Sequence, residues 1–208
     1  ADFGYDGTFS GAVELVAEGA PAGSSPGGSA QFTGGFINVP GIDMNTMIRD
    51  FGTGDYTMTC WIKPSDVAGE KFIFGQTNQG IHNGIRNNSY LHQAHWGADT
   101  NGATQLAPYL AADEDGWVHA AFVYDGEADQ GTIYLDGQQD WAGQKNAPNG
   151  GGNLIIGGRN NGDGNQYQGL IDEVAVWTSA LSAEKILELA EGGSPSGGSP
   201  VPLEITNI

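Results

Sequence analysis

The chain has little cysteine, little positive charge and no long apolar run. Cys60 is the single cysteine among 208 residues, so no disulfide can form within the chain. Seven Lys and Arg residues stand against 25 Asp and Glu residues, which gives a formal net charge of −18. Nucleic acid is therefore not an expected partner, because phosphates require a basic surface. No apolar stretch approaches the roughly 20 residues of a membrane span, so membrane insertion is not expected either.

Glycine is the abundant residue, with 35 copies, and it clusters with Pro, Asn, Asp and Ser between short apolar runs. This punctuation is typical of many short strands joined by tight turns. A chain of this length suits one all-β sandwich and can bury a substantial core without disulfides. The composition therefore favours a single all-β domain.

Alternating apolar residues predict a series of strands. The expected strands cover residues 12–16, 31–40, 56–64, 71–74, 81–86, 90–96, 117–124, 131–135, 153–157 and 170–177. Within one of them, Cys60 shares a face with Tyr56, Met58 and Ile62, which predicts a small buried hydrophobe rather than a nucleophile. The run Lys71–Phe74 is almost fully apolar, which predicts burial on both faces of its sheet.

One short C-terminal helix is expected after the last of these strands. Ser182 is a good N-cap, Glu184 suits the first turn, and Leu181 can pack against Ile186 as a hydrophobic staple. Gly192 and Gly193 should end the helix. These signals predict a domain over residues 1–191, a Gly/Ser/Pro linker over 192–200, and either an extra strand or the start of a further domain over 201–208.

Several ordered motifs give the chain a family resemblance. The motifs are Phe32–Pro40, Tyr56–Pro64, Trp117–Gly126 with its Trp-Val-His start, Gly131–Gly137 and Tyr167–Ser182. Together they resemble the laminin-G-like and concanavalin-A-like jelly-roll modules of the bacterial extracellular type. The resemblance implies a two-sheet antiparallel β-sandwich (jelly roll). It also implies an extracellular or cell-surface, non-catalytic carbohydrate-binding or adhesion module, whose partner is a glycan or another cell-surface ligand.

The start of the chain departs from the pattern of that family. The stretch Asp2–Thr8 resembles a turn that follows an opening core strand in the family, so we expect the opening strand to be absent here. A sandwich that lacks a strand exposes unpaired backbone groups. The segment Val201–Ile208, from the same chain or from a neighbour, could fill the groove. This gives the alternative function of a filament subunit that self-associates by donor-strand exchange.

The resemblance also implies a structural calcium ion between the N-terminal turn and the last core strand. Carried over to this sequence, the ligands are Asp2, Asp6 and Asp172, with a carbonyl oxygen from Gly4. Such hard oxygen ligands suit Ca²⁺. In the alternative interpretation, Asp2 and Asp6 are ordinary turn formers and Asp172 caps a loop.

Three of the four histidines, His82, His92 and His95, lie close together in the sequence, which raises the question of a zinc site. A two-residue turn at 87–88 would place Asn83 opposite His92. That register puts His82 and His95 on the face opposite to His92, so a zinc site is not expected.

The same segment predicts a sugar platform, because sugars stack on aromatic rings and bond to amide, imidazole and guanidinium groups. The expected residues are Asn83, Arg86, Tyr90, His92 and Trp96. In the alternative interpretation, Tyr90 and Trp96 belong to the core and the histidines are only hydrogen-bonded.

Catalysis is not expected. Jelly-roll glycoside hydrolases place two carboxylates across a cleft, on a Glu-x-Asp-x-x-Glu strand motif that this sequence does not contain. No Ser/His/Asp or Cys/His arrangement stands out either.

Overall fold

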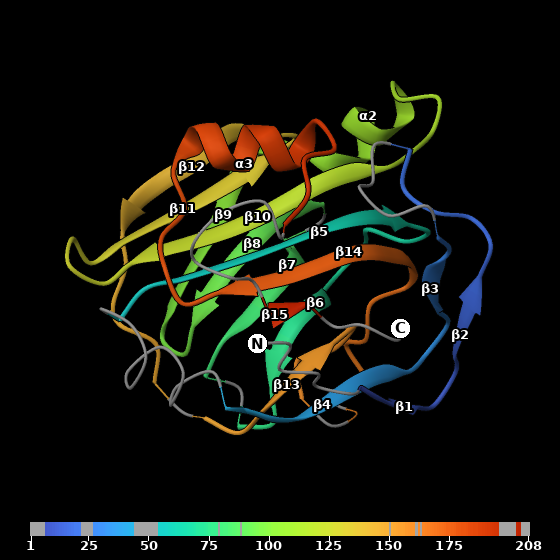
Figure 1. The fold of residues 1–208 in the computed structure, drawn as a ribbon, viewed down its shortest axis with the longest axis horizontal. Helices are drawn as coiled ribbons and strands as arrows, with labels where there is room; N and C mark the ends of the chain where they lie inside the picture. The colour runs from blue at the N-terminus through green and yellow to red at the C-terminus, as the bar shows by residue number, and fades with distance from the viewer. Residues whose placement is uncertain are drawn as a thin grey trace.

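The chain folds into two antiparallel sheets packed face to face (Figure 1). The computed structural model describes residues 7–21, 27–43, 54–78, 80–87, 89–149, 151–160, 162, 164–195 and 203–204. Every strand pairing in the two sheets of this described part is antiparallel. The expected all-β sandwich of the jelly-roll type is therefore confirmed.

The two sheets draw their strands from distant parts of the chain. The seven-stranded sheet contains, in spatial order, β1 (Thr8–Ser10), β4 (Phe36–Asp43), β13 (Asn153–Ile156), β6 (Lys71–Gln76), β7 (His82–Arg86), β8 (Tyr90–His95) and β9 (Ala98–Gln105). The eight-stranded sheet contains β12 (Gln138–Gln144), β11 (Gln130–Leu135), β10 (Val118–Asp125), β5 (Tyr56–Pro64), β14 (Gly169–Trp177), β3 (Ser29–Phe32), β2 (Val13–Val16) and β15 (Leu203–Glu204), the last of which pairs with β14.

The seam between the sheets is apolar because alternate side chains of each strand face inward. On β5 the inward residues are Tyr56, Met58, Cys60 and Ile62, and all four are fully buried. The predicted burial of Cys60 is thereby confirmed, and burial raises the pKa of its thiol. On β6, Phe72, Ile73 and Phe74 are buried on both faces, also as predicted.

Strand β14 changes its phase in mid-strand. Strict alternation would send Ile171 and Val174 to opposite faces, yet both belong to the buried seam. The pairing of β14 with β5 shifts between Asp172 and Ala175, and Glu173 has a φ of 51°. This bulge inserts an extra residue and returns the apolar side chains after it to the core.

A buried polar network lies at one end of the seam. The Tyr56 hydroxyl is 2.7 Å from His95 Nε2, and the Gln93 amide donates to the same hydroxyl at 3.1 Å. The Lys145 ammonium donates to the Gln93 carbonyl oxygen. Burial lowers the pKa of His95 to about 3 and that of Lys145 to about 8.

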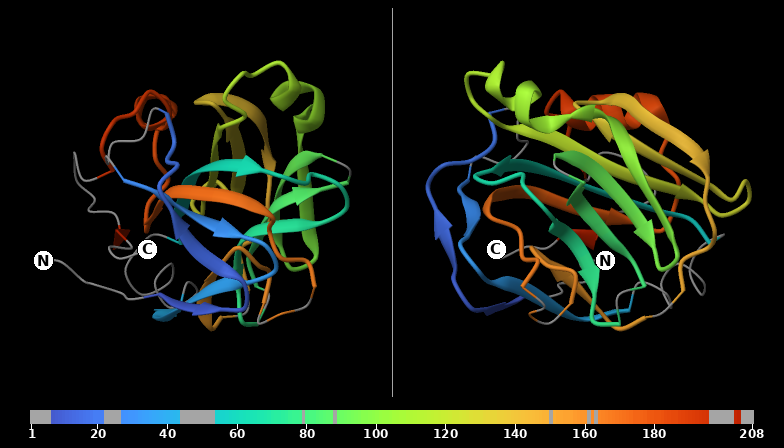
Figure 2. Two further views of the ribbon diagram at one scale, coloured as in Figure 1. Left: turned by 90° about the vertical axis from the view of Figure 1, so that its right-hand side faces the viewer. Right: turned by 180° about the vertical axis from the view of Figure 1, so that it is seen from behind.

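The outer faces of the two sheets differ. Helix α3 (Ala183–Ala190) lies over the outer face of the eight-stranded sheet (Figure 1). There Ile186 belongs to one buried apolar cluster with Ala121 and Tyr134. A second helix, α2 (Leu106–Ala111), follows β9 at one end of the sandwich. Strands β6 to β9 are seen from outside in the right-hand view of Figure 2, with no described helix across them.

The predicted helix start is confirmed, since Lys185 N donates to the Ser182 hydroxyl at 3.3 Å. Other elements differ from the expectation. Residues 31–40 form parts of two strands, β3 and β4, which belong to opposite sheets. Strands β1, β9 and β12 and helix α2 were also not predicted. Strands β9 and β12 are largely polar edge elements without a clear apolar period, and β1 and α2 are short, with three and six residues.

Strand β15 pairs with β14 of its own chain. Glu204 is the partner of Ala175, and Leu203 is the partner of Val176. Since β5 occupies one edge of β14, strands β15 and β3 share the other edge. Leu203 and Glu204 therefore extend the eight-stranded sheet along the part of the β14 edge that β3 does not pair with.

The buried histidines predict a loss of stability in mild acid. His95 and His119 have folded-state pKa values of about 3 and about 4 because of burial, against an ordinary value of 6.5. Burial of the neutral rings contributes fully to the free energy of unfolding above pH 6.5. This contribution is lost as the pH falls from 6.5 toward the folded-state pKa values, because the histidines of the unfolded chain take up protons first. We expect about 1–2 kcal/mol less stability per histidine at pH 5 than at pH 7, measured by urea denaturation. A His119→Gln variant should show a flatter profile, and an unchanged slope would contradict this assignment.

The pairing of β15 predicts the effect of a C-terminal truncation. A chain that ends at Gly193 loses the two-residue ladder on β14, and each lost hydrogen bond costs about 1 kcal/mol. We expect a lower urea midpoint for the truncated chain and a monomer in both cases by light scattering. A Glu204→Pro variant, which removes one N–H donor, should fall between them. Oligomers formed only by the intact chain would instead indicate strand exchange.

Candidate functional site

The hairpin of β7 and β8 sets which side chains reach the outer face of the seven-stranded sheet. Arg86 pairs with Tyr90 and Gly84 pairs with His92, so the connecting loop has three residues. Asn87 and Ser89 in this loop have positive φ values of 50° and 91°. The predicted two-residue turn is therefore wrong, and the one-residue difference in register exchanges the faces of β7.

The corrected register brings together charged residues from β7, from β9 and from the position before β6. The Arg86 guanidinium pairs with Glu70 through Nε at 2.6 Å and with Asp99 through Nη1 at 2.5 Å. Glu70 precedes β6, Arg86 ends β7 and Asp99 lies on β9. One guanidinium thus links two carboxylates across this face.

His92 lies next to these ion pairs and has a defined tautomer. Its Nδ1 is 2.8 Å from Asn101 Oδ1, which can only accept, so Nδ1 carries the proton. Its Nε2 is 3.4 Å from Arg86 Nη1, which can only donate. Burial lowers the pKa of His92 to about 4, so the ring is neutral near pH 7.

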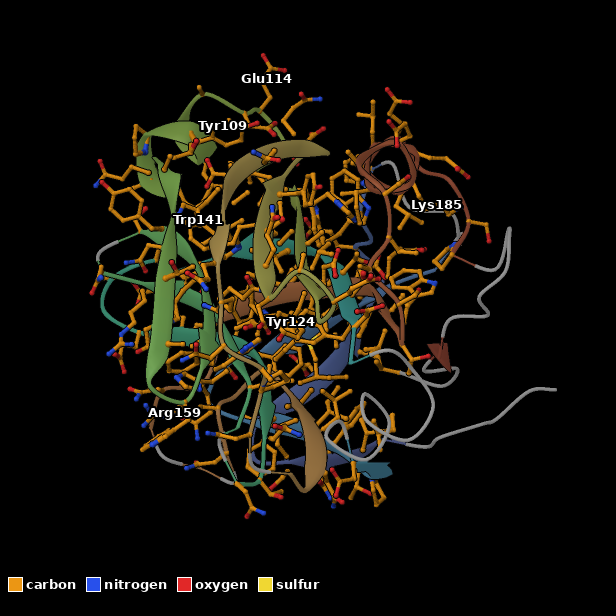
Figure 3. All side chains as sticks on the ribbon, turned by 90° about the vertical axis from the view of Figure 1, so that its left-hand side faces the viewer. Tyr109, Glu114, Tyr124, Trp141, Arg159 and Lys185 are labelled. Atoms are coloured by element: carbon orange, nitrogen blue, oxygen red, sulfur yellow. The ribbon has the colours of Figure 1, made fainter. Side chains whose placement is uncertain are left out.

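The Phe72 ring and the loop that carries Arg159 pack against the residues around Arg86 and His92. The Phe72 ring contacts the rings of His82 and His92 edge-on at centroid distances of 5.5 and 6.4 Å, and the Arg159 guanidinium lies 5.2 Å from the Phe72 centroid. The loop after β13 reaches the sheet at Gly75, where a Cβ would lie only 2.3 Å from the Arg159 carbonyl oxygen. Gly75 therefore lets the loop that carries Arg159, labelled in Figure 3, pack against the sheet.

Trp96 is the exposed aromatic residue of this face. It follows β8 directly, and 59% of its surface is accessible. Its ring lies 6.1 Å from the ring of His82, which is itself buried. A flat apolar surface therefore lies at the solvent boundary beside a group of hydrogen-bonding side chains.

The structure separates the predicted sugar-binding residues. Arg86, Tyr90, His92 and Trp96 lie on the outer face of the seven-stranded sheet, and we call them and their neighbours on this face the outer-face group. Asn83 instead is fully buried on the inner side. There Asn83 accepts the Ala94 N–H at 3.1 Å and contacts Met58. Asn83 therefore cannot be part of the outer-face group.

The sequence reasoning missed several members of this group, namely Glu70, Phe72, Asp99, Asn101 and Arg159. It considered His82 but placed it on the face opposite to His92, and the observed register puts the two histidines on the same face. Asp99 and Asn101 are two residues apart in a polar segment, so a predicted strand there would have placed both side chains on the same face. The sequence offers this signal for these two residues.

Of the predicted calcium ligands, only Asp172 belongs to the described residues, and Asp2, Gly4 and Asp6 lie outside them. The two carboxylate oxygens of Asp172 accept the N–H groups of Ala20 and Glu173, both at 2.8 Å. Half-burial raises the pKa of this carboxyl. Within the described part of the chain, Asp172 belongs to no group of three metal-ligating side chains.

The chain belongs to the concanavalin A-like lectin/glucanases superfamily, whose sequence pattern it matches over residues 38–187. This confirms the expected family. No curated protein matches the chain. Among the described residues, no helix has the length and apolar character needed to cross a bilayer.

Solved structures share the fold at low sequence identity. Domain 4 of the extracellular arabinanase AbnA from Geobacillus stearothermophilus, in complex with arabinotriose, is 20% identical with a TM-score of 0.63, covering 88% of this chain and 87% of that one. A putative carbohydrate-binding protein from Bacteroides ovatus is 20% identical with a TM-score of 0.61, covering 81% of this chain and 48% of that one. The sialidase CBM40 of Ruminococcus gnavus, bound to sialyllactose, is 16% identical with a TM-score of 0.52, covering 65% and 82%.

The contacts of His92 predict its protonation behaviour. We expect its ring to remain neutral between pH 5 and pH 7, with the proton on Nδ1, because burial disfavours the charged form and Asn101 accepts from Nδ1. Nitrogen-15 NMR of the labelled imidazoles distinguishes the tautomers. An Asn101→Ala variant should shift the ring toward the other tautomer. A titration of His92 near 6.5 would contradict the assignment.

Proposed function

We propose that this protein is an extracellular, non-catalytic carbohydrate-binding module whose ligand site is the outer face of the seven-stranded sheet around Trp96. The observation that carries the proposal is the exposed Trp96 ring beside buried His82 and the ion-paired Arg86 and Asp99. An aromatic plate can stack on the C–H face of a sugar, and the neighbouring polar groups can bond its hydroxyls.

Membership of a superfamily of lectins and glucanases supports this class of ligand. Two structures of the same fold were solved with bound sugars, one with arabinotriose and the other with sialyllactose. The arabinanase that contains the first of these domains is extracellular, which supports an accessory role outside the cell for the present chain as well.

The charges of the face favour a neutral sugar over an acidic one. Arg86 is already paired with Glu70 and Asp99, and Arg159 lies 3.9 Å from Glu70. With a formal net charge of −18, the whole chain would also repel a polyanionic glycan. Beside these ion pairs the face carries amide, imidazole and hydroxyl groups, which can exchange hydrogen bonds with the uncharged hydroxyl groups of a sugar.

The carboxylates of this face support a binding role rather than hydrolysis. A glycosidase needs one carboxylic acid that is protonated and another that is free to attack or to activate water. Here Glu70 and Asp99 are both held by the same guanidinium. The described carboxyls with a raised pKa, Asp136 and Asp172, lie on other elements and accept backbone N–H bonds.

Substitution of Trp96 tests the proposed site. A glycan array first identifies a neutral ligand, and we expect Trp96→Ala to weaken its Kd about tenfold, or about 1.4 kcal/mol, because the stacking surface is lost. Tyr109→Ala is the matched control, since Tyr109 is another exposed aromatic residue, on α2 and labelled in Figure 3. Isothermal titration measures both variants.

The Trp96 variant should keep the melting temperature of the original chain, because 59% of this residue is accessible. Tyr109 is less exposed, at 38%, and its hydroxyl donates to Asp136 at 2.7 Å, so circular dichroism must confirm that the control variant is folded. Unchanged binding by the Trp96 variant would place the site elsewhere. Absence of any glycan ligand for the original chain would reject the function itself.

A structural calcium ion held by Asp172 with Asp2, Asp6 and the Gly4 carbonyl remains a proposal. Its support is the family resemblance and the half-buried position of Asp172. We expect Ca²⁺ to raise the melting temperature of the metal-stripped chain and Asp172→Asn to remove that increase, because the ion binds only the folded state. No increase in the original chain would eliminate this ion.

A further inference from the structure

We propose that His82, His92 and Asp99 form a site for a divalent transition metal ion of the zinc class on the outer face of the seven-stranded sheet. The two imidazoles and the carboxylate each offer one ligand atom, and these atoms all lie within 4.8 Å of one another. His82 Nε2 and Asp99 Oδ1 are 3.7 Å apart. Ligand atoms on a tetrahedral zinc ion are about 3.3–3.5 Å apart, so closure requires only small side-chain movements.

The sheet holds the ligands in place before any ion arrives. His82 lies on β7, His92 on β8 and Asp99 on β9, three hydrogen-bonded neighbours in one sheet. Both histidines are at least 95% buried, and their rings lie 6.2 Å apart above the Phe72 ring. Ligands on adjacent strands lose little conformational freedom when they bind a metal.

The surroundings of His92 favour metal binding. A metal-ligating histidine usually donates its second ring N–H to a carbonyl or carboxylate oxygen. Asn101 Oδ1 accepts from His92 Nδ1 at 2.8 Å, which leaves the Nε2 lone pair directed toward the cluster. The group that contacts this lone pair is the Arg86 guanidinium, at 3.4 Å.

Arg86 is the group that the ion must displace. Its Nη1 contacts both His92 Nε2 and Asp99 Oδ2, so the guanidinium cation occupies the same ligands that a metal would use. Its Nε is also paired with Glu70 at 2.6 Å. The guanidinium can therefore keep this ion pair when a metal ion displaces it from Asp99. Metal binding and the Arg86–Asp99 ion pair are therefore alternatives.

The donor set selects the class of ion. Two imidazole nitrogens and one carboxylate oxygen suit Zn²⁺ and its neighbours in the transition series, whereas Ca²⁺ and Mg²⁺ prefer oxygen ligands alone. Three protein ligands leave a fourth position for water or for a ligand hydroxyl. The exposed Trp96 ring lies beside His82, so the proposed metal site and the proposed sugar site are neighbours on this face. The metal site does not depend on the glycan function.

Titration of the metal-stripped intact chain with ZnCl₂ tests the site without any glycan. We expect one equivalent to bind with a micromolar Kd by isothermal titration, and CoCl₂ to give the visible absorption bands of tetrahedral Co²⁺. His92→Gln and Asp99→Asn should each weaken binding at least tenfold, since each removes one of three ligands. Arg86→Met should tighten binding several-fold, because it removes the competing cation.

Two control variants separate this site from non-specific binding to an acidic protein. His119→Gln removes a buried histidine on β10, and Glu114→Gln removes an exposed carboxylate. Both should bind Zn²⁺ as the original chain does. Circular dichroism confirms that each variant is folded. No binding by the original chain, or equal binding by the His92, Asp99 and control variants, would overturn the proposal.

Discussion

The burial of alternate apolar side chains between two sheets is the constraint on which the rest of this structure depends. It fixes which face of each strand turns inward, and it therefore also fixes what remains on the outer faces. Where the sequence breaks the alternation, the backbone adapts. The bulge at Glu173 returns Val174 to the core after Ile171 and keeps the seam continuous. The face on which the candidate residues of β7, β8 and β9 lie follows from this inward requirement.

The outer face of the seven-stranded sheet combines two kinds of surface. Buried imidazoles and a shared guanidinium form a rigid polar floor, and the exposed Trp96 ring borders it. In an acidic chain, the pairing of Arg86 with two carboxylates leaves this face without an excess of positive charge. Neutral sugars and small cations are the ligand classes that such a surface suits. Helix α3 covers the outer face of the other sheet instead.

Much of the fold could be predicted from the sequence, because strands β5, β10, β11 and β14 are rich in apolar residues, turn residues 87–89 separate β7 from β8, and helix α3 carries clear end signals. The polar edge strands β9 and β12 escaped prediction, since edge strands need not alternate. The candidate site was only partly predicted. Arg86, Tyr90, His92 and Trp96 were selected together, but Asn83 was assigned to the wrong face by a turn shorter by one residue than the observed one.

The sequence by itself determined the family, the sandwich class, the buried state of Cys60 and the start of the C-terminal helix, because these depend on local periods and local hydrogen bonds. Only the tertiary structure decided the register of the β7–β8 hairpin and, through it, the meeting of His82, His92 and Asp99. Nothing local distinguishes a two-residue from a three-residue loop at Asn87. The choice is made by which register buries Ile85 and Leu91 in the seam, and that is a property of the packed sheets.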